Sequence, residues 1–489
     1  MRGQTMEFHG GCHGSCRDCE DGSGAAGFPT GDVADALDRI FKPSSVAVVG
    51  ASANPEKTGH TILKNILDGG FAGRVYPINP GGGEILGLQA YPSLSGIPGQ
   101  VDLAVVVVPA KVVPDVMRQA GDRGVGGAVI ISGGFREVGN DDLEREVTTI
   151  ARSFGIRVIG PNCQGVNYTA SGLCASWPLI TRKGGMAVIS QSGTVGAALG
   201  EWAEDEGIGI SAFVSLGNKA DVDEIDLISY FGKDPNTRVI SLYMEGTQDG
   251  RRFMEICREA LKSKPVVVLR PGRTEKGRKA AESHTKSIAG NHMIFDGVCK
   301  QVGITRAGSV RELYDFSKAL MFAERRAMRT AARRKPYRVA VLTSSGGSGI
   351  IAADAAQECG IEVPDLGAEA MERLKAALPS HCVVRNPLDL TGDTPAERYE
   401  VGVSELASSE EVDAFLLIFG DPIPRATEVV TRLKSGLKSN GRAPEIVVCY
   451  IGGGAVGKDE SARMQKAGIP VFPTPERAVR AIGALAGRI

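Results

Sequence analysis

The sequence contains no long apolar segment. No uninterrupted apolar run reaches the roughly 18 residues that a membrane-spanning helix requires. The first residues also lack the apolar core of a secretory leader. Both absences predict a cytoplasmic protein without a membrane partner.

There is also no excess of charge of either sign. The chain has 56 basic and 57 acidic residues among its 489, so its formal net charge is −1. Proteins that bind nucleic acid or anionic membranes through electrostatics usually carry a basic excess. We therefore expect no nucleic-acid partner. The composition, with 42% hydrophobic and 23% charged residues, indicates a globular protein.

The ten cysteines do not form the pattern of a disulfide framework. Most lie in apolar segments, which in a cytoplasmic chain indicates buried thiols. Cys12, Cys16 and Cys19 are the exception, because their spacing and two nearby histidines can hold an iron–sulfur cluster. No hydrophobic run encloses them, so the favoured interpretation is a flexible Gly-rich tail over residues 1–35 without a bound metal.

From residue 46 onward, short β-branched runs alternate with amphipathic stretches, which is the pattern of parallel α/β units. The runs fall into three groups, and the chain is too long for a single core. The charged, Ala-rich stretch 324–336 separates the second group from the third and is typical of a linker. Strands are predicted at 46–50, 74–80, 102–109, 126–132 and 157–163, then at 186–193, 211–218, 238–246 and 265–272, and finally at 337–347, 413–420, 445–454 and 468–472.

The second and third units open in the same way, with a strand, a Ser/Gly-rich turn and an Ala-rich helix. The turns are "SQSG" at 190–193 and "SSGG" at 344–347. Such a turn exposes backbone N–H groups at a helix N-terminus, where anions bind. Repetition of one fold unit explains the two copies, and so do two helix dipoles directed at one phosphate. The pattern alone leaves both explanations open.

The first unit opens with "VVGASANPEKTGHTILKNIL" (48–67), which predicts a strand, a glycine turn and a helix start, as in a Rossmann domain. It lacks the G-x-G-x-x-G spacing of NAD sites, and Asn79-Pro80 stands where such sites carry an acidic residue. Lys57 and Arg74 suit additional phosphate groups better than a free ribose diol. We therefore predict a phosphorylated nucleotide such as coenzyme A. The alternative is a degenerate Rossmann domain in which Lys57 is only a solvated charge.

Nine motifs follow one another between Leu37 and the C-terminus. They are "VGAS-x-x-P-x-K-x-G" at 49–59, "YPINP" at 76–80, "ISGGFRE" at 131–137, "GPNCQGV" at 160–166, "SQSGTVGAA" at 190–198, "GNKADVDEIDLISY" at 217–230, "YMEGTQDGR" at 243–251, "SHTKSIAG" at 283–290 and "NPLDLTGD" at 386–393. In these motifs the chain resembles the α subunit of the NDP-forming acyl-CoA synthetases, particularly the ADP-forming acetate–CoA ligases, which are relatives of succinyl-CoA synthetase. The resemblance implies an α/β protein with a CoA-binding Rossmann-like domain over 36–170. Two flavodoxin-like domains of the succinyl-CoA synthetase type are implied over 180–323 and 337–489.

The resemblance also implies a reaction and its residues. Acyl-CoA, ADP and phosphate are interconverted with a carboxylic acid, CoA and ATP through an acyl phosphate and a phosphohistidine. The phosphorylated residue corresponds to His284, and the residue that orients its imidazole corresponds to Glu245. Phosphate contacts are implied at Ser190, Gln191, Ser192, Gly193, Ser344, Ser345, Gly346 and Gly347. CoA contacts are implied at Gly50, Ala51, Ser52, Lys57, Asn79, Pro80, Pro109, Ser132 and Asn162, with "PNC" (161–163) near the thiol.

The loop around His284 departs from the family pattern at one position. Lys286 stands where the family more often has glycine. A lysine beside a phosphohistidine can screen charge, contact a partner subunit or remain solvated, and the sequence leaves these roles open.

The sequence contains no recognisable ATP-grasp module with acidic Mg²⁺ ligands and a nucleotide lid. The resemblance therefore implies that ADP or ATP and Mg²⁺ bind to a separate ATP-grasp β subunit in a hetero-oligomer, and that the His284 loop moves between two sites. Two rival hypotheses are an NAD(P)-dependent oxidoreductase and a CoA-binding regulatory or scaffold protein without turnover. The missing dinucleotide features argue against the first, whereas the second predicts CoA binding without a labelled histidine.

Overall fold

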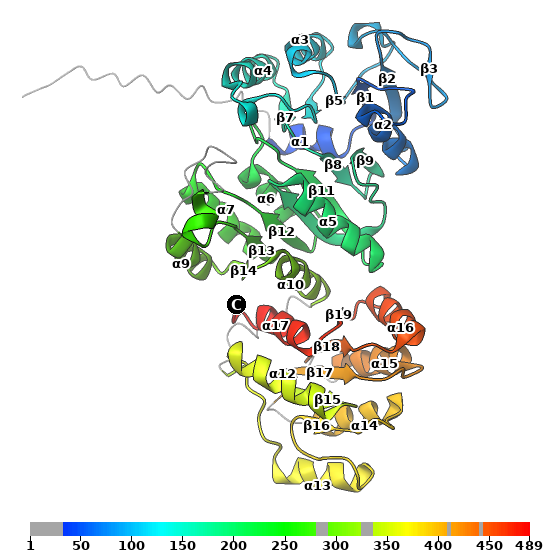
Figure 1. Ribbon diagram of the computed structural model, residues 1–489, viewed down its shortest axis with the longest axis vertical. Coiled ribbons are helices and arrows are strands. Elements are labelled where there is room, and N and C mark those ends of the chain that lie inside the picture. The colour runs from blue at the N-terminus through cyan, green and yellow to red at the C-terminus, as the bar shows by residue number, and fades with distance from the viewer. Residues whose placement is uncertain (1–32, 280–291, 324–335, 408–411, 440–443) are drawn as a thin grey trace, which may run out of the picture.

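The computed structural model describes residues 33–279, 292–323, 336–407, 412–439 and 444–489. The loop with His284 and Lys286, the cysteine-bearing segment and nearly all of the predicted linker lie outside these ranges. Three sheets with helices on their faces follow one another along the long axis in sequence order (Figure 1). The predicted α/β class is confirmed. No helix in the described ranges is long and apolar enough to cross a bilayer.

The first sheet is parallel and has the strand order β2-β1-β5-β6-β7. Four of its strands are buried along their whole length, which explains why most of their residues are apolar in the sequence. The strands are β1 (Ser45–Val49), β2 (Arg74–Ile78), β5 (Leu103–Val106), β6 (Gly127–Ile130) and β7 (Arg157–Ile159), and a small hairpin consists of β3 (Glu84–Ile85) and β4 (Leu88–Gln89). The helices are α1 (Val33–Phe41), α2 (Thr58–Asp68), α3 (Val113–Asp122) and α4 (Asp141–Ser153).

The second sheet has the order β14-β13-β12-β10-β11-β8-β9. Its first five strands are parallel, whereas β8 (Gly165–Tyr168) and β9 (Leu173–Ser176) add an antiparallel hairpin to β11. This hairpin was not predicted, because its two strands contain a single β-branched residue, Val166. The other strands are β10 (Lys183–Ser190), β11 (Ile210–Ser215), β12 (Val239–Tyr243), β13 (Val266–Leu269) and β14 (Thr305–Ala307). The helices are α5 (Gly193–Asp205), α6 (Glu224–Lys233), α7 (Gly250–Leu261), α9 (His292–Val302) and α10 (Val310–Phe322).

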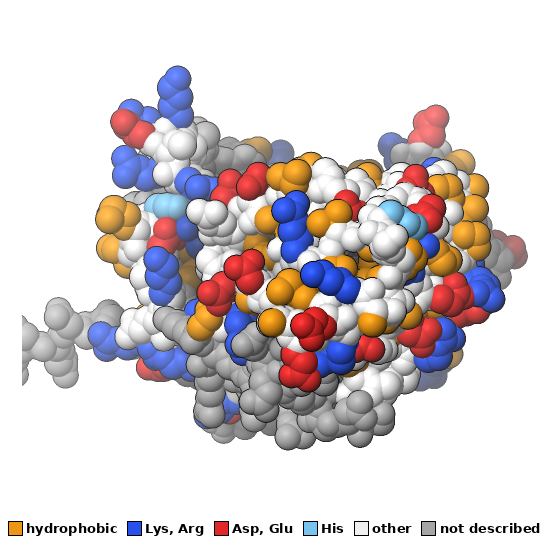
Figure 2. Space-filling model, turned by 90° about the horizontal axis from the view of Figure 1, so that it is seen from below, with side chains coloured by type: hydrophobic (Ala, Val, Ile, Leu, Met, Phe, Trp, Pro, Cys, Tyr) orange, Lys and Arg blue, Asp and Glu red, His pale blue; other side chains and the backbone are white. Residues whose placement is uncertain are grey.

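The third sheet is parallel and has the order β16-β15-β17-β18-β19. Its strands are β15 (Val339–Thr343), β16 (Leu388–Asp389), β17 (Ala414–Phe419), β18 (Glu445–Tyr450) and β19 (Val471–Phe472). The helices are α12 (Gly346–Glu358), α13 (Ala368–Ala377), α14 (Ala396–Ala407), α15 (Ala426–Ser439), α16 (Gly454–Lys466) and α17 (Pro475–Leu485). Figure 2 views this end of the molecule, where acidic and basic side chains intermingle over the surface.

The three sheets share their hydrophobic cores. Successive residues of a strand point to opposite faces, so Ile189 of β10 packs in a core with Ile62 of the first sheet's α2. Its neighbour Val188 packs in a second core with Val341 of β15. The outer faces of the first and third sheets have cores of their own. The core on each side of the middle sheet therefore continues into a neighbouring domain.

Buried polar contacts also connect the second and third sheets. Arg477 of α17 donates to both carboxylate oxygens of Asp315 on α10, at 2.7 and 2.8 Å. Lys318, one turn further along α10, is fully buried and donates to Glu206 at 2.8 Å and to the carbonyl of Val471 at 2.7 Å. Helices α10 and α17 lie between the two sheets (Figure 1). These contacts fix the orientation of the third domain against the second.

Candidate active site

A cavity of about 920 Å³ lies where the second sheet meets the first domain. Residues from both domains line it, and the strand ends of β7, β10, β11 and β12 all contribute. The lining residues that matter for its chemistry are Arg136, Asn162, Cys163, Gln164, Gln191, Ser192, Gly193, Thr194, Asn218, Lys219, Glu245 and Gly246. Ligands of doubly wound folds bind at such carboxyl ends of parallel strands. The predicted Glu245, residues 191–193 of the predicted turn and Asn162 thus share one cavity.

Glu245 follows the end of β12, and side chains from two neighbouring strands hold its backbone. Its N–H donates to the side-chain oxygen of Gln191 at 2.9 Å. The guanidinium of Arg270, just beyond β13, donates to its carbonyl at 3.4 Å. Burial and the negative charge of Glu245 raise the pKa of Tyr243 to about 12. Glu245 is therefore an anchored carboxylate at the cavity wall.

The turn at 190–193 ends β10 and starts α5. Ser192 is the N-cap, and its side chain accepts the N–H of Val195 at 3.5 Å. Gly196 lets the helix pack closely on its strand, because a Cβ there would lie 2.6 Å from the ring of Phe213 and 2.7 Å from Cβ of Ser190. The first turn of α5 is thereby held at the cavity, where its unpaired N–H groups and the helix dipole favour an anion.

The predicted CoA residues lie at the carboxyl edge of the first sheet. Gly50 ends β1 with a left-handed φ of 95°, and α2 approaches so closely that a Cβ on Gly59 would lie 1.9 Å from the Gly50 carbonyl. The Asn79 amide donates to the Ala51 carbonyl at 2.8 Å, and the Ser132 hydroxyl donates to the Val108 carbonyl at 2.6 Å. Ser52, Lys57, Pro80 and Pro109 lie in the loops after the same strands.

Asn162 and Cys163 connect this edge to the cavity. Asn162 has a left-handed φ of 57°, and its amide donates to Asn218 of the second domain at 3.3 Å. The thiol of Cys163 is buried against the Ile130 carbonyl at 3.3 Å, and burial raises its pKa to about 12. A thiol in this state stays protonated, so Cys163 shapes the wall and is no nucleophile.

The third unit's turn lies elsewhere. Ser345 is the N-cap of α12, and a Cβ on Gly346 would lie 2.7 Å from a carboxylate oxygen of Asp389. Ser344 accepts the N–H of Gly420 at 2.9 Å. The lining of the 920 Å³ cavity includes no described residue of the third sheet's domain. In the described ranges, the two predicted phosphate turns therefore do not share a cavity.

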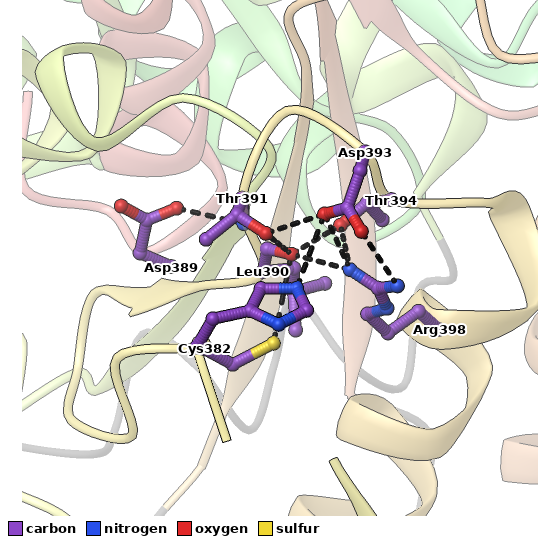
Figure 3. A network of polar contacts seen from close by, with 8 residues as sticks. Cys382, Asp389, Leu390, Thr391, Asp393, Thr394 and Arg398 are labelled. Carbon is purple, nitrogen blue, oxygen red and sulfur yellow. Dashed lines mark hydrogen bonds and ion pairs between the residues drawn. The ribbon is translucent and has the colours of Figure 1, made fainter. Parts of the chain in front are cut away.

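The loop after β16 is held by a compact polar network (Figure 3). Thr391 has a left-handed φ of 69°, and its hydroxyl donates to Asp393 at 2.6 Å. Arg398 donates to Asp393 at 3.0 Å and to the Leu390 carbonyl at 2.9 Å. The Arg398 guanidinium and the Thr391 hydroxyl hold the pKa of Asp393 far below its usual range. The motif at 386–393 thus builds a rigid turn beside α12.

Lys219 lines the cavity but was not among the residues predicted from the sequence. Its ammonium donates to the Gly246 carbonyl at 2.6 Å and to Glu224 at 2.8 Å. In the sequence it stands in a polar stretch, where a lysine is usually solvated. Two signals were present: Lys219 lies in the motif at 217–230, and Glu224 follows five residues later, at the start of a helix.

Three family models match the chain, one for each sheet. A CoA binding domain matches residues 44–169, a succinyl-CoA ligase like flavodoxin domain matches 183–320, and a Ligase-CoA domain matches 339–486. Fold and cavity therefore define a protein of the succinyl-CoA ligase type, in which a CoA-binding domain precedes two ligase domains.

Individual relatives narrow this class. The chain is 40% identical to the acetate–CoA ligase (ADP-forming) I subunit alpha of Pyrococcus furiosus, over 92% of this chain and 97% of that one. It is 41% identical to the acetate–CoA ligase (ADP-forming) I of Archaeoglobus fulgidus over 92% of its own length, but spans 63% of that longer protein. The solved dinucleotide-forming acetyl-coenzyme A synthetase 1 of Ca. Korarchaeum cryptofilum, in complex with phosphate and ADP, matches with a TM-score of 0.83 at 39% identity, over 92% of this chain and 96% of that one. The chain belongs to the family of ADP-forming acetate–CoA ligases, which confirms the resemblance.

Proposed function

We propose that the chain is the α-type subunit of an ADP-forming acyl-CoA synthetase. It would interconvert acyl-CoA, ADP and phosphate with a carboxylic acid, CoA and ATP, through an acyl phosphate and a phosphohistidine at His284. The observation that carries this proposal is the cavity that Glu245 shares with the N-terminus of α5 and with Asn162, at the edge of the first domain. A carboxylate, a helix N-terminus and an adjoining CoA-type domain are what the acyl half of the reaction needs.

The chemistry divides between these groups. A phosphate oxygen attacks the thioester carbonyl, the C–S bond breaks, and CoA leaves as the thiol. The acyl phosphate then gives its phosphoryl group to an imidazole nitrogen of His284 and leaves as a carboxylate. Glu245 accepts a hydrogen bond from the N–H of the other imidazole nitrogen, which fixes the tautomer and stabilises the charged phospho-form. The N–H groups in the first turn of α5, which begins at Gly193, stabilise the phosphoryl oxygens, because fixed dipoles need no reorganisation during the transfer.

CoA would bind along the carboxyl edge of the first sheet, at Gly50, Ala51, Ser52, Lys57, Asn79, Pro80, Pro109 and Ser132. Asn162 would then lie next to the thiol end. Two features support this placement: these residues all follow strand ends of one sheet, and residues 44–169 match a CoA binding domain. The turn at 344–347 would serve the phosphoryl group at a different stage of the reaction.

The nucleotide half-reaction would need a separate β subunit with an ATP-grasp fold that holds ADP or ATP and Mg²⁺. The name of the P. furiosus relative, a subunit alpha, supports a partner subunit. A hetero-oligomer in the cytoplasm follows from this proposal.

Incubation with radiolabelled phosphate and a panel of acyl-CoAs tests the proposal. We expect acid-labile, base-stable label on the wild-type chain with at least one acyl-CoA, and none on His284→Ala. CoA binding without label, even with the partner subunit added, would instead support a regulatory or scaffold protein. A nicotinamide fluorescence titration tests the oxidoreductase alternative, for which we expect no binding.

A further inference from the structure

Lys219 is a buried lysine in a left-handed turn between β11 and α6. Its φ is 46°, and its side chain is 8% exposed, while that of its partner Glu224 is 1% exposed. Of the three hydrogens on its ammonium, one is directed to Glu224 and one to the Gly246 carbonyl. Burying an ion pair contributes little net stability compared with apolar side chains, so stability alone does not account for it.

The contact with Gly246 is one of three side-chain hydrogen bonds to the backbone of the turn that carries Glu245. Gln191 from the β10 side accepts the Glu245 N–H, and Arg270 from the β13 side donates to the Glu245 carbonyl. Lys219 from the β11 side donates to the carbonyl of the following residue, Gly246. Gly246 has no side chain to fix its own conformation. Lys219 therefore holds the peptide that follows Glu245, whereas Gln191 and Arg270 hold Glu245 itself.

The third domain contains the same arrangement with the charges reversed. In the second domain, Ser215 pairs with Ser190, and the N–H of the next residue, Leu216, donates to the Ser190 carbonyl. In the third domain, Asp389 pairs with Thr343, and the N–H of the next residue, Leu390, donates to the Thr343 carbonyl. A left-handed residue follows in both, Gly217 or Thr391.

By this count Asp393 occupies the place of Lys219, and Arg398 occupies the place of Glu224 (Figure 3). Both pairs form ion pairs, with nitrogen–oxygen distances of 2.8 Å for Lys219 and Glu224 and 3.0 Å for Arg398 and Asp393. The fold thus accepts either polarity at this position. Ion pairing alone therefore does not explain why the second domain has the basic residue at position 219. The turn of Glu245 explains it, because in the third domain the position of Glu245 is occupied by Gly420, which has no carboxylate.

We propose that Lys219 is a positioning residue for Glu245. Its ammonium, held by Glu224, fixes the Gly246 carbonyl and through that peptide the direction of the Glu245 carboxylate at the cavity wall. This inference rests on the proposed function for its catalytic consequence, but its structural part does not. Loss of the contact frees the turn, and a small misplacement of a catalytic group costs about 10²-fold in rate.

The structural part is tested first, by hydrogen exchange of the full chain. In Lys219→Met, the peptide covering 243–249 should exchange at least about fivefold faster than in wild type, because its anchoring is weakened. Lys264→Met is the matched control: Lys264 is also buried and donates to the backbone carbonyls of Phe231 and Asp234 in the same domain, away from the cavity. It should leave that peptide unchanged. Unchanged exchange in Lys219→Met overturns the proposal, whatever the enzymatic activity.

The catalytic part is tested by single-turnover labelling from acyl-CoA and phosphate. Lys219→Met should lower the rate about 10²-fold, with half-saturating acyl-CoA changed less than about twofold. In combination with Glu245→Gln it should add almost nothing to the loss of Glu245→Gln alone, because both act through one carboxylate. Additive losses would overturn the proposal, since Lys219 would then act independently of Glu245.

A charge swap separates this role from simple pairing. Lys219→Glu with Glu224→Lys restores an ion pair of the polarity seen at Asp393 and Arg398, but cannot donate from position 219 to Gly246. Labelling should stay as low as in Lys219→Met, and Lys219→Arg, which keeps a donor, should recover part of it. Full recovery by the swap would contradict the proposal. If the wild-type chain itself takes no label, the proposed function fails, and the exchange experiment alone decides on Lys219.

Discussion

The second and third domains repeat one unit of backbone, and only one of them builds the proposed catalytic wall. In both, the hydroxyl that ends the central strand donates to the N-cap carbonyl: Ser190 to Ser192, and Thr343 to Ser345. In both, the next side chain accepts an N–H from the end of the neighbouring strand. That N–H belongs to Glu245 in one domain and to Gly420 in the other. The repeated turn therefore provides the same backbone arrangement in both domains, whereas only Glu245, after the adjacent strand, provides a carboxylate for the proposed reaction.

The largest effect is expected at the position where the two units differ. Glu245→Gln keeps the size and the backbone contact to Gln191 but removes the carboxylate that we place beside His284. Labelling from acyl-CoA and phosphate should fall roughly 10²-fold or more, which is the usual contribution of a positioned acid–base group. Gly420 occupies the place of Glu245 in the third domain, so the comparison variant there is Asp393→Asn, which removes the carboxylate at the place of Lys219 and should change labelling less than about twofold. Equal losses of labelling in both variants would contradict the proposal that only the second domain carries a catalytic carboxylate.

The helix that follows each turn packs against its strand at a glycine, and the two glycines have different room. A Cβ on Gly196 would lie 2.6 Å from the ring of Phe213, whereas a Cβ on Gly349 would lie 3.1 Å from Cβ of Pro387. Gly196→Ala should therefore cost about 1–3 kcal/mol, as overpacking does, and Gly349→Ala clearly less. Urea midpoints monitored by circular dichroism compare them. A larger loss for Gly349→Ala would show that the tighter packing lies in the third domain.

The N-caps differ by a smaller amount. The Ser192 side chain accepts an N–H of its own helix, whereas that of Ser345 accepts the hydroxyl of Ser348 at 3.1 Å. Ser192→Ala should destabilise by about 1 kcal/mol, the typical loss of a cap, and Ser345→Ala by only a few tenths. Thermal midpoints of the two variants, measured side by side, check this order. A larger decrease for Ser345→Ala than for Ser192→Ala would contradict it.

The smallest effect is the pH dependence of the exposed pair in the third domain. Arg398 and Thr391 hold the pKa of Asp393 below that of the unfolded chain. The stabilisation is therefore present above the unfolded pKa of about 4 and is lost as the pH falls through the folded pKa. Wild type and Asp393→Asn should differ slightly in urea midpoint at pH 6, and the difference should vanish in strong acid. A difference that persists there would show that Asp393 acts through shape rather than charge.

Much of this architecture is visible in the sequence, because buried parallel strands produce uninterrupted apolar runs and each Ser/Gly turn marks a helix start. Residues 190–193 and Glu245 were predicted, and 191–193 line one cavity with Glu245. The antiparallel hairpin at β8 and β9 was missed, since β11, far along the chain, stabilises it rather than local propensity. Lys219 was missed for a similar reason: only the fold brings Gly246 to its ammonium. That the two turns lie in separate parts of the molecule also depends on tertiary packing, which no local pattern records.

The central claim is that this cavity serves transfer of a phosphoryl group to His284. Mass spectrometry of the 280–292 segment, after incubation of the full chain with acyl-CoA and phosphate under alkaline conditions that preserve phosphohistidine, tests it most directly. We expect one added phosphoryl group on His284 in wild type, and a much slower appearance of it in Glu245→Gln. A phosphoryl group on another residue, or equal rates in the two proteins, would contradict it.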